Sequence, residues 1–152
     1  MFEREHDGAF RAPDRYPANA LATFTTHDLP TFSGWMTGQD LILKRSIGID
    51  PGESDEARPH SRVALQSALE AHGPGNDFPA VAQYLARTPS RLVLVALEDV
   101  LGMTDQINIP GTIKQYPNWR KRMPLSIEQL KADRMLNRIA EIFSQAGRAS
   151  ST

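Results

Sequence analysis

A histidine and a carboxylate, His27 and Asp28, follow directly on an apolar, β-branched run of the sequence. Leu29 precedes a proline and is therefore biased towards extended geometry, which holds Asp28 in a stiff turn. A carboxylate at the end of a strand can stabilise developing positive charge or accept hydrogen bonds from the hydroxyls of a substrate. The alternative is a structural turn that Asp28 caps while His27 bonds to backbone, because such Asx turns are frequent.

A second polar turn lies in residues 107–119, INIPGTIKQYPNW. Pro110-Gly111 fits the centre of a type II turn, which needs a residue with positive φ at its third position. Such a rigid turn would place Asn108 beside a pocket, where its amide suits hydrogen bonding to sugar or amide groups. A purely structural loop is the alternative. Trp119 can stack on a flat ligand face or cover the end of a sheet.

Three basic residues, Arg120, Lys121 and Arg122, stand beside Trp119. Aromatic and cationic side chains together bind single-stranded nucleic acid, so an RNA-binding tail is one interpretation. A single patch of this size in a chain of net charge −1 gives that interpretation little support, and we expect no nucleic-acid partner.

Several other chemistries lack the residues that they need. The chain has no cysteine, which excludes disulfides and thiolate metal sites. The histidines lack metal-ligand spacing, and the sequence contains no P-loop, dinucleotide fingerprint or nucleophile elbow. No apolar run approaches the ~18 residues of a membrane span, and the first residues are charged, unlike a secretory signal. We therefore expect a soluble, cytoplasmic protein with no metal, cofactor or membrane partner.

Two buried strands are expected to position the polar turns, over residues 20–26 and 91–97. Both are apolar without clean alternation, which is typical of a parallel sheet covered on both faces. An Asp7-Gly8 pair predicts the turn of a weak hairpin. Helices are expected over 37–48, 60–73, 78–88 and 126–147, with a short helical piece at 98–103.

The last expected helix has the best-defined ends. Ser126 and Gln129 have the spacing of a capping box, and Gly147 is placed to end the helix. The order of elements is strand, helices, strand, long loop and helix. Two parallel strands need neighbours on either side, and nothing else in the chain offers them. The sequence therefore indicates a piece of a larger α/β sheet or barrel.

The two segments that contain the polar turns resemble a known family. ATFTTHDLPTFSGWMTGQDL, followed by TPSRLVLVALEDVLGMTDQINIPGTIKQYPNWRKRMPLSIEQL, is similar to the C-terminal end of 4-α-glucanotransferases, the amylomaltases or disproportionating enzymes. The resemblance covers about residues 1–147. It includes the His-Asp pair after a strand, the Glu-Asp-Val-Leu-Gly segment, the Asn-x-Pro-Gly-Thr turn and the Pro-Asn-Trp-Arg tail, in the family's order.

The resemblance implies an α/β fold: residues 1–152 would be the C-terminal part of a (β/α)₈ TIM barrel, mostly helical, supplying strands seven and eight. The remainder of the barrel would lie outside this chain and would be its partner. Such enzymes move segments between α-1,4-glucans and maltooligosaccharides with retention, which uses a carboxylate nucleophile and a carboxylic acid/base. By motif match, Asp28 would be the third, transition-state-stabilising carboxylate. His27 would bond to the same sugar unit, and Asn108 would lie near the substrate.

No residue of this chain matches the family's nucleophile or its acid/base. The chain would therefore be catalytically inactive alone, and we expect transfer only when the rest of the barrel is supplied. The alternative function is a non-catalytic module that binds a glucan or another protein.

Overall fold

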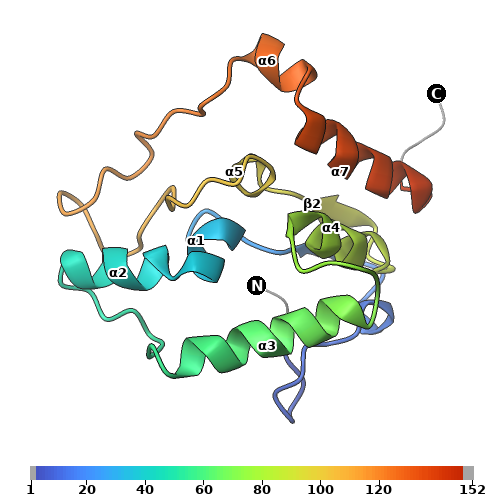
Figure 1. Cartoon of the computed structure of the whole chain (residues 1–152), viewed down its shortest axis with the longest axis horizontal. Helices are drawn as coiled ribbons and strands as arrows, with labels where there is room; N and C mark the ends of the chain where they lie inside the picture. Colours follow the sequence, from blue (N-terminus) through green and yellow to red (C-terminus); the bar gives the residue numbers. More distant parts are fainter. Residues whose placement is uncertain (1–2, 149–152) are drawn as a thin grey trace.

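A two-stranded parallel sheet joins the two apolar runs in the computed structural model, which describes residues 3–148 (Figure 1). Strand β1 (Leu21–Thr23) pairs with β2 (Leu92–Leu94) in a register that sets Ala22 opposite Val93. The predicted parallel pairing is confirmed. Both strands are shorter than expected, because only residues that oppose a partner complete the hydrogen-bonded ladder.

One face of this sheet is covered and the other is open. Ala22 is 4% exposed and belongs to the core, whereas Leu21, Leu92 and Leu94 are 47%, 62% and 58% exposed. Within the described residues the sheet is therefore covered on one face, and burial on both faces stays a prediction that requires the neighbours this chain does not offer. The helices of residues 3–148 pack on the face that carries Ala22 and Val93 and leave the leucine face uncovered.

Helices α3 (Ala57–Glu70) and α4 (Phe78–Ala86) confirm two of the expected helices and contribute much of the core. The N-terminus of α4 is capped by Asp77, whose side chain accepts a hydrogen bond from Ala80 N. Nearly every residue of α4 is buried, as its uniformly apolar sequence requires. The most deeply buried large side chains of the core are Phe24, Trp35, Leu65, Leu69, Tyr84 and Leu85.

The helix expected over 37–48 corresponds to α2 (Gln39–Ser46), and a further helix that was not expected, α1 (Phe32–Thr37), precedes it. The side chain of Thr31 accepts a hydrogen bond from Gly34 N and caps the N-terminus of α1. Gly38 has φ 80°, a left-handed conformation that glycine adopts without strain, and it ends α1.

A buried arginine on α3 ties α1 and α2 to that helix. The guanidinium of Arg58 donates two 2.8 Å hydrogen bonds to the carboxylate of Asp40, a third to the carbonyl of Trp35 and a fourth to Glu53. It also lies 4.9 Å from the ring centroid of Trp35. Arg58 and Asp40 are almost fully buried, so the pair is shielded from solvent.

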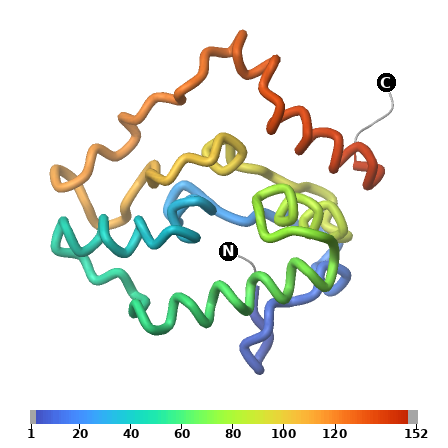
Figure 2. Tube along the Cα trace, viewed as in Figure 1, coloured from blue at the N-terminus to red at the C-terminus, as the bar shows by residue number. Residues whose placement is uncertain are grey.

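The C-terminal third consists of a short helix, a long irregular segment and two further helices (Figure 2). Helix α5 (Leu97–Val100) follows β2, and the irregular segment then runs past α2 to α6 (Ile127–Lys131) and α7 (Arg134–Gln145). The predicted capping box at α6 is confirmed, with both of its hydrogen bonds present. Asp133 starts a new helix, so the expected single helix is two, and α7 packs against α4.

The predicted N-terminal turn is confirmed by an antiparallel bridge between Arg4 and Phe10, and a short helix, η1 (Pro13–Arg15), follows it. Among the described residues, no helix is long and apolar enough to cross a membrane.

Candidate functional site

The polar turns that follow β1 and β2 lie side by side. Parallel strands present their carboxyl ends at the same edge of the sheet, so His27 and Asp28 after β1 face the segment that follows β2 and α5. The side chain of Asn108, from that segment, donates a 2.6 Å hydrogen bond to Asp28 Oδ1. The structure therefore brings together the three residues that the sequence singled out separately.

The carboxylate of Asp28 is also close to its neighbour, because His27 Nε2 lies 3.4 Å from the same Oδ1. The side chains of His27 and Asp28 are about half exposed, at 55% and 47%. The contacts with Asn108 and His27 both involve Oδ1 of Asp28. Within residues 3–148, no hydrogen bond is made to Oδ2. Asp28 thus bonds to another loop rather than capping its own turn.

The turn that carries His27 and Asp28 is held at both ends. Thr25 is buried, and its hydroxyl donates a 3.0 Å hydrogen bond to the carbonyl of Pro30, while Leu29 N donates to Thr26 O. Beyond the turn, Phe32 N donates a 2.6 Å hydrogen bond to Asp99 Oδ1. The first turn of α1 is thereby fixed to α5.

Asp99 is buried, and its second carboxyl oxygen has no hydrogen-bond partner among the described residues. Burial disfavours the charged form and raises the pKa of Asp99 to about 6, although the bond from Phe32 N acts in the opposite direction. This carboxyl group therefore titrates close to neutral pH within the element that supports the site.

The second polar turn has the predicted form. Thr112 N donates to Ile109 O across Pro110-Gly111, and Gly111 has φ 80°, as the third position of a type II turn requires. The side chain of Asn118 accepts a hydrogen bond from Ile109 N and donates to Thr112 O, which closes the loop on itself. The backbone next to Asn108 is consequently well braced.

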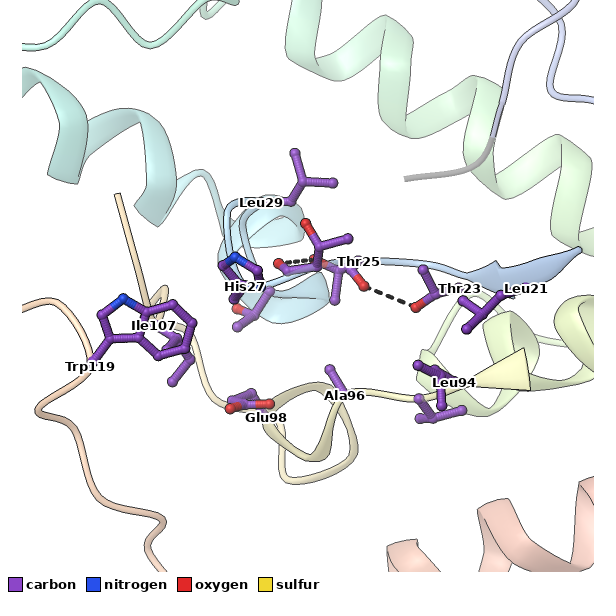
Figure 3. Close-up of a pocket in the computed structure, with 13 residues that line it drawn as sticks. Leu21, Thr23, Thr25, His27, Leu29, Leu94, Ala96, Glu98, Ile107 and Trp119 are labelled. Atoms are coloured by element: carbon purple, nitrogen blue, oxygen red, sulfur yellow. Dashed lines mark hydrogen bonds between the residues drawn. The ribbon is translucent and has the colours of Figure 1, made fainter. Parts of the chain in front are cut away.

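A hollow of about 410 Å³ opens beside these turns, between the open face of the sheet and the segment that ends at Trp119 (Figure 3). Its lining is mainly apolar and hydroxylated, with His27 at one end; other lining residues are Leu21, Thr23, Thr25, Leu94, Glu98 and Trp119. The ring of His27, which contacts Asp28, therefore connects the carboxylate to this hollow.

Trp119 lies against His27, with 4.9 Å between the ring centroids (Figure 3). The indole is 63% exposed, and the residue has φ 61°. Trp119 thus packs beside the proposed site residues. Of the basic residues that follow it, Lys121 forms an ion pair with Asp105, 2.5 Å apart, which neutralises part of the basic patch.

Two polar residues near the site were missed from the sequence. Glu98 lines the hollow, and its position directly after the second apolar run could have indicated this. Gln106 is buried beside Asn108 and contacts the backbone of both turns, and no sequence signal distinguishes it from an ordinary loop glutamine.

Comparisons with known proteins agree with the resemblance seen in the sequence. The model of the 4-alpha-glucanotransferase family matches residues 1–127. A 4-alpha-glucanotransferase of Mycobacterium tuberculosis is 34% identical over 167 residues, which cover 95% of this chain and 23% of that protein. One from Haemophilus influenzae is 30% identical over 142 residues, covering 81% of this chain and 20% of its own length.

Among solved structures, an amylomaltase from Corynebacterium glutamicum superposes with a TM-score of 0.75 at 27% identity. The match covers 93% of this chain and 24% of that one. The chain belongs to the 4-alpha-glucanotransferase family. It spans less than a quarter of the length of the relatives named here.

Proposed function

We propose that this chain is the part of a 4-α-glucanotransferase that holds the third carboxylate of the active site. The observation that carries the proposal is the bond between Asp28 and Asn108, which joins the turns after two parallel strands in a chain of this family. The reaction would be transfer of α-1,4-glucan segments between maltooligosaccharides or longer glucans, with retention at the anomeric carbon.

The chain would supply strands seven and eight of a (β/α)₈ barrel. The open leucine face supports this arrangement, since Leu21, Leu92 and Leu94 would be costly to leave in water. The outer edges of β1 and β2 offer unpaired backbone groups to further strands. The small share of the relatives that the chain matches agrees with a barrel completed by residues outside these 152.

In the proposed mechanism, Asp28 stabilises positive charge in an oxocarbenium-like transition state and accepts hydrogen bonds from sugar hydroxyls. His27 bonds to the same sugar unit, and Asn108 holds Asp28 and lies near the substrate. The nucleophile and the acid/base belong to the rest of the barrel, because no motif for either occurs in this sequence. The chain alone should consequently show no transfer.

The test is a chimera in which this chain replaces the matching quarter of the Corynebacterium glutamicum amylomaltase. Transfer from maltotriose, followed by glucose release, should be present in the chimera and lost by at least about 100-fold in D28N, as for other transition-state-stabilising groups. D55N, at an exposed carboxylate on the segment before α3, is the matched control and should retain activity. An unchanged rate in D28N would show that Asp28 has been assigned the wrong role.

A second candidate function is a glucan-binding module without catalysis. The exposed indole of Trp119 beside His27 favours it, because an aromatic face can stack on a sugar ring. Calorimetry of the 152-residue chain with maltoheptaose decides between them. Binding by the chain, together with an inactive chimera, would favour the module, whereas an active chimera favours the transferase.

A further inference from the structure

A buried glutamine lies between the two turns of the site. Gln106 is 2% exposed, and its side-chain nitrogen donates to two backbone carbonyls, that of Asp28 at 2.9 Å and that of Asn108 at 2.7 Å. An amide nitrogen carries two hydrogens, so each one serves a different turn. Among the described residues, no other side-chain amide donates to backbone carbonyls of both turns.

The same two residues are also joined through their side chains, by the 2.6 Å bond from Asn108 Nδ2 to Asp28 Oδ1. Gln106 therefore completes a closed ring of hydrogen bonds that runs through both backbones and both side chains. A ring of this kind fixes not only how far apart the two turns lie but also how the carboxylate of Asp28 is rotated, because a shift of either turn breaks two bonds at once.

Gln106 is itself held in place. The hydroxyl of Tyr116, a buried residue further along the same segment, donates a 2.5 Å hydrogen bond to the carbonyl of Gln106. Both the backbone and the side chain of Gln106 are thus anchored, so the amide can act as a rigid spacer between the turns.

The carbonyl oxygen of the Gln106 side chain makes no compensating contact. Gln106 Oε1 is buried and has no hydrogen-bond partner among residues 3–148. A buried polar atom without a partner costs free energy, which an apolar side chain of similar shape would avoid. What the glutamine contributes at this position is consequently its two donated bonds rather than packing.

We propose that Gln106 is a positioning residue that sets the carboxylate of Asp28 for the transition state by clamping the backbones of Asp28 and Asn108. The proposal rests on the proposed function, because it presumes that Asp28 acts on a glucan. A displacement of about 1 Å can cost about 100-fold in rate when a group must meet a transition state. Loss of the clamp should therefore lower kcat and leave KM nearly unchanged.

The test compares Q106M, Q106N and D28N in the chimera with the Corynebacterium glutamicum amylomaltase. Methionine retains the shape of glutamine without its donors, and asparagine retains the amide but is too short to reach both carbonyls. Each variant at position 106 should lower kcat for transfer from maltotriose by about 10- to 100-fold, with KM changed less than about threefold. Q145M, at an exposed glutamine of α7, is the matched control and should leave both constants unchanged.

A second measurement reports on the clamp in the 152-residue chain without any sugar. In NMR spectra, the side-chain amide protons of Asn108 should exchange with water at least about tenfold faster in Q106M, while signals from α3 and α4 stay in place. An unfolded Q106M would show collapsed signals throughout, and Q106N would then be the variant that decides.

The two proposals fail in different ways. Loss of activity in D28N together with wild-type kcat in Q106M and Q106N would overturn the positioning role and leave the proposed function standing. Full activity in D28N would overturn the proposed function. In that case, unchanged exchange of the Asn108 amide in Q106M would overturn the clamp as well, whereas faster exchange would support it as a structural feature.

Discussion

The indole of Trp119 packs against the imidazole of His27 at an angle of 47° between the ring planes, and it does so from a left-handed backbone conformation. Among the described residues, Trp119 is the one non-glycine residue with positive φ. Its amide donates a 3.1 Å hydrogen bond to the carbonyl of Ile107. A left-handed conformation is costly for a bulky side chain, so these contacts hold the backbone in a strained state beside the site.

The strain at Trp119 can be measured by comparing W119G with W119A. Both variants lose the indole, and only glycine accepts φ 61° without a penalty. We expect W119G to have the higher free energy of unfolding, by about 1 kcal/mol, in urea titrations. At Arg122, an exposed residue of the same segment without positive φ, the order should be reversed, because glycine is the more flexible residue in the unfolded chain. W119A at least as stable as W119G would contradict this account.

The buried pair of Arg58 and Asp40 should be among the strongest single contributions to the stability of the chain. D40A leaves the guanidinium partly unpaired in the core, and we expect the free energy of unfolding to fall by about 3–5 kcal/mol. R58M/D40L removes both charges, so it should be less destabilised than the sum of the single variants. Additive losses in the double variant would mean that the two side chains act independently.

The exposed pair of Arg45 and Asp55 provides the matched control for this prediction. Its 2.8 Å contact is geometrically similar, but both side chains lie in solvent. D55A should leave the urea midpoint nearly unchanged, since an exposed ion pair is screened by water and salt. A loss comparable to that of D40A would show that burial is not what makes the Arg58 pair strong.

The elements were predictable from the sequence wherever local chemistry decides them. The capping box at Ser126 and the type II turn at Pro110-Gly111 depend on residues a few positions apart, and both are present. The boundary between α1 and α2 at Gly38 was missed because no helix was expected before residue 37, and the division at Asp133 was missed because the apolar periodicity continues across it. In both places a local signal was available, a glycine that can adopt positive φ and an aspartate that can cap a helix.

The residues of the candidate site could be singled out one by one from the sequence, but their arrangement could not be predicted. His27 and Asp28 were singled out because they end an apolar run, and Asn108 because it precedes a rigid turn. The bond between Asp28 and Asn108 depends on the parallel pairing of two distant strands, which the sequence suggests only in outline. Gln106 could not be found at all, because nothing in the sequence shows which carbonyls its side chain reaches once the chain has folded.

The open leucine face gives a prediction that tests the proposed barrel. L94K places a charge on a side chain that is 58% exposed in this chain, so the unfolding free energy of the chain alone should change little. In the chimera with the Corynebacterium glutamicum amylomaltase, the same charge would be buried without a partner, and we expect insoluble or inactive protein. An active, soluble L94K chimera would show that this face does not point into a barrel.

The carboxyl group of Asp99 should make the stability of the chain depend on pH. Its folded pKa of about 6 lies above the ordinary value of 3.8, so the folded chain binds this proton more tightly than the unfolded chain does. The free energy of unfolding therefore falls as the pH rises from the ordinary pKa towards the folded pKa. The loss of stability is complete above about pH 6. At 1.36 kcal/mol per pKa unit, the total loss from this group is about 3 kcal/mol.

D99N isolates this contribution, because asparagine does not titrate and can still accept the hydrogen bond from Phe32 N. Urea titrations between pH 4 and pH 7.5 should show the stability of wild type falling relative to D99N by up to about 3 kcal/mol as the pH rises. D14N, at an exposed carboxylate, is the matched control and should follow the wild-type profile. Parallel profiles for wild type and D99N would show that Asp99 does not bind a proton on folding, and the link between α1 and α5 would then be made by a carboxylate that stays charged.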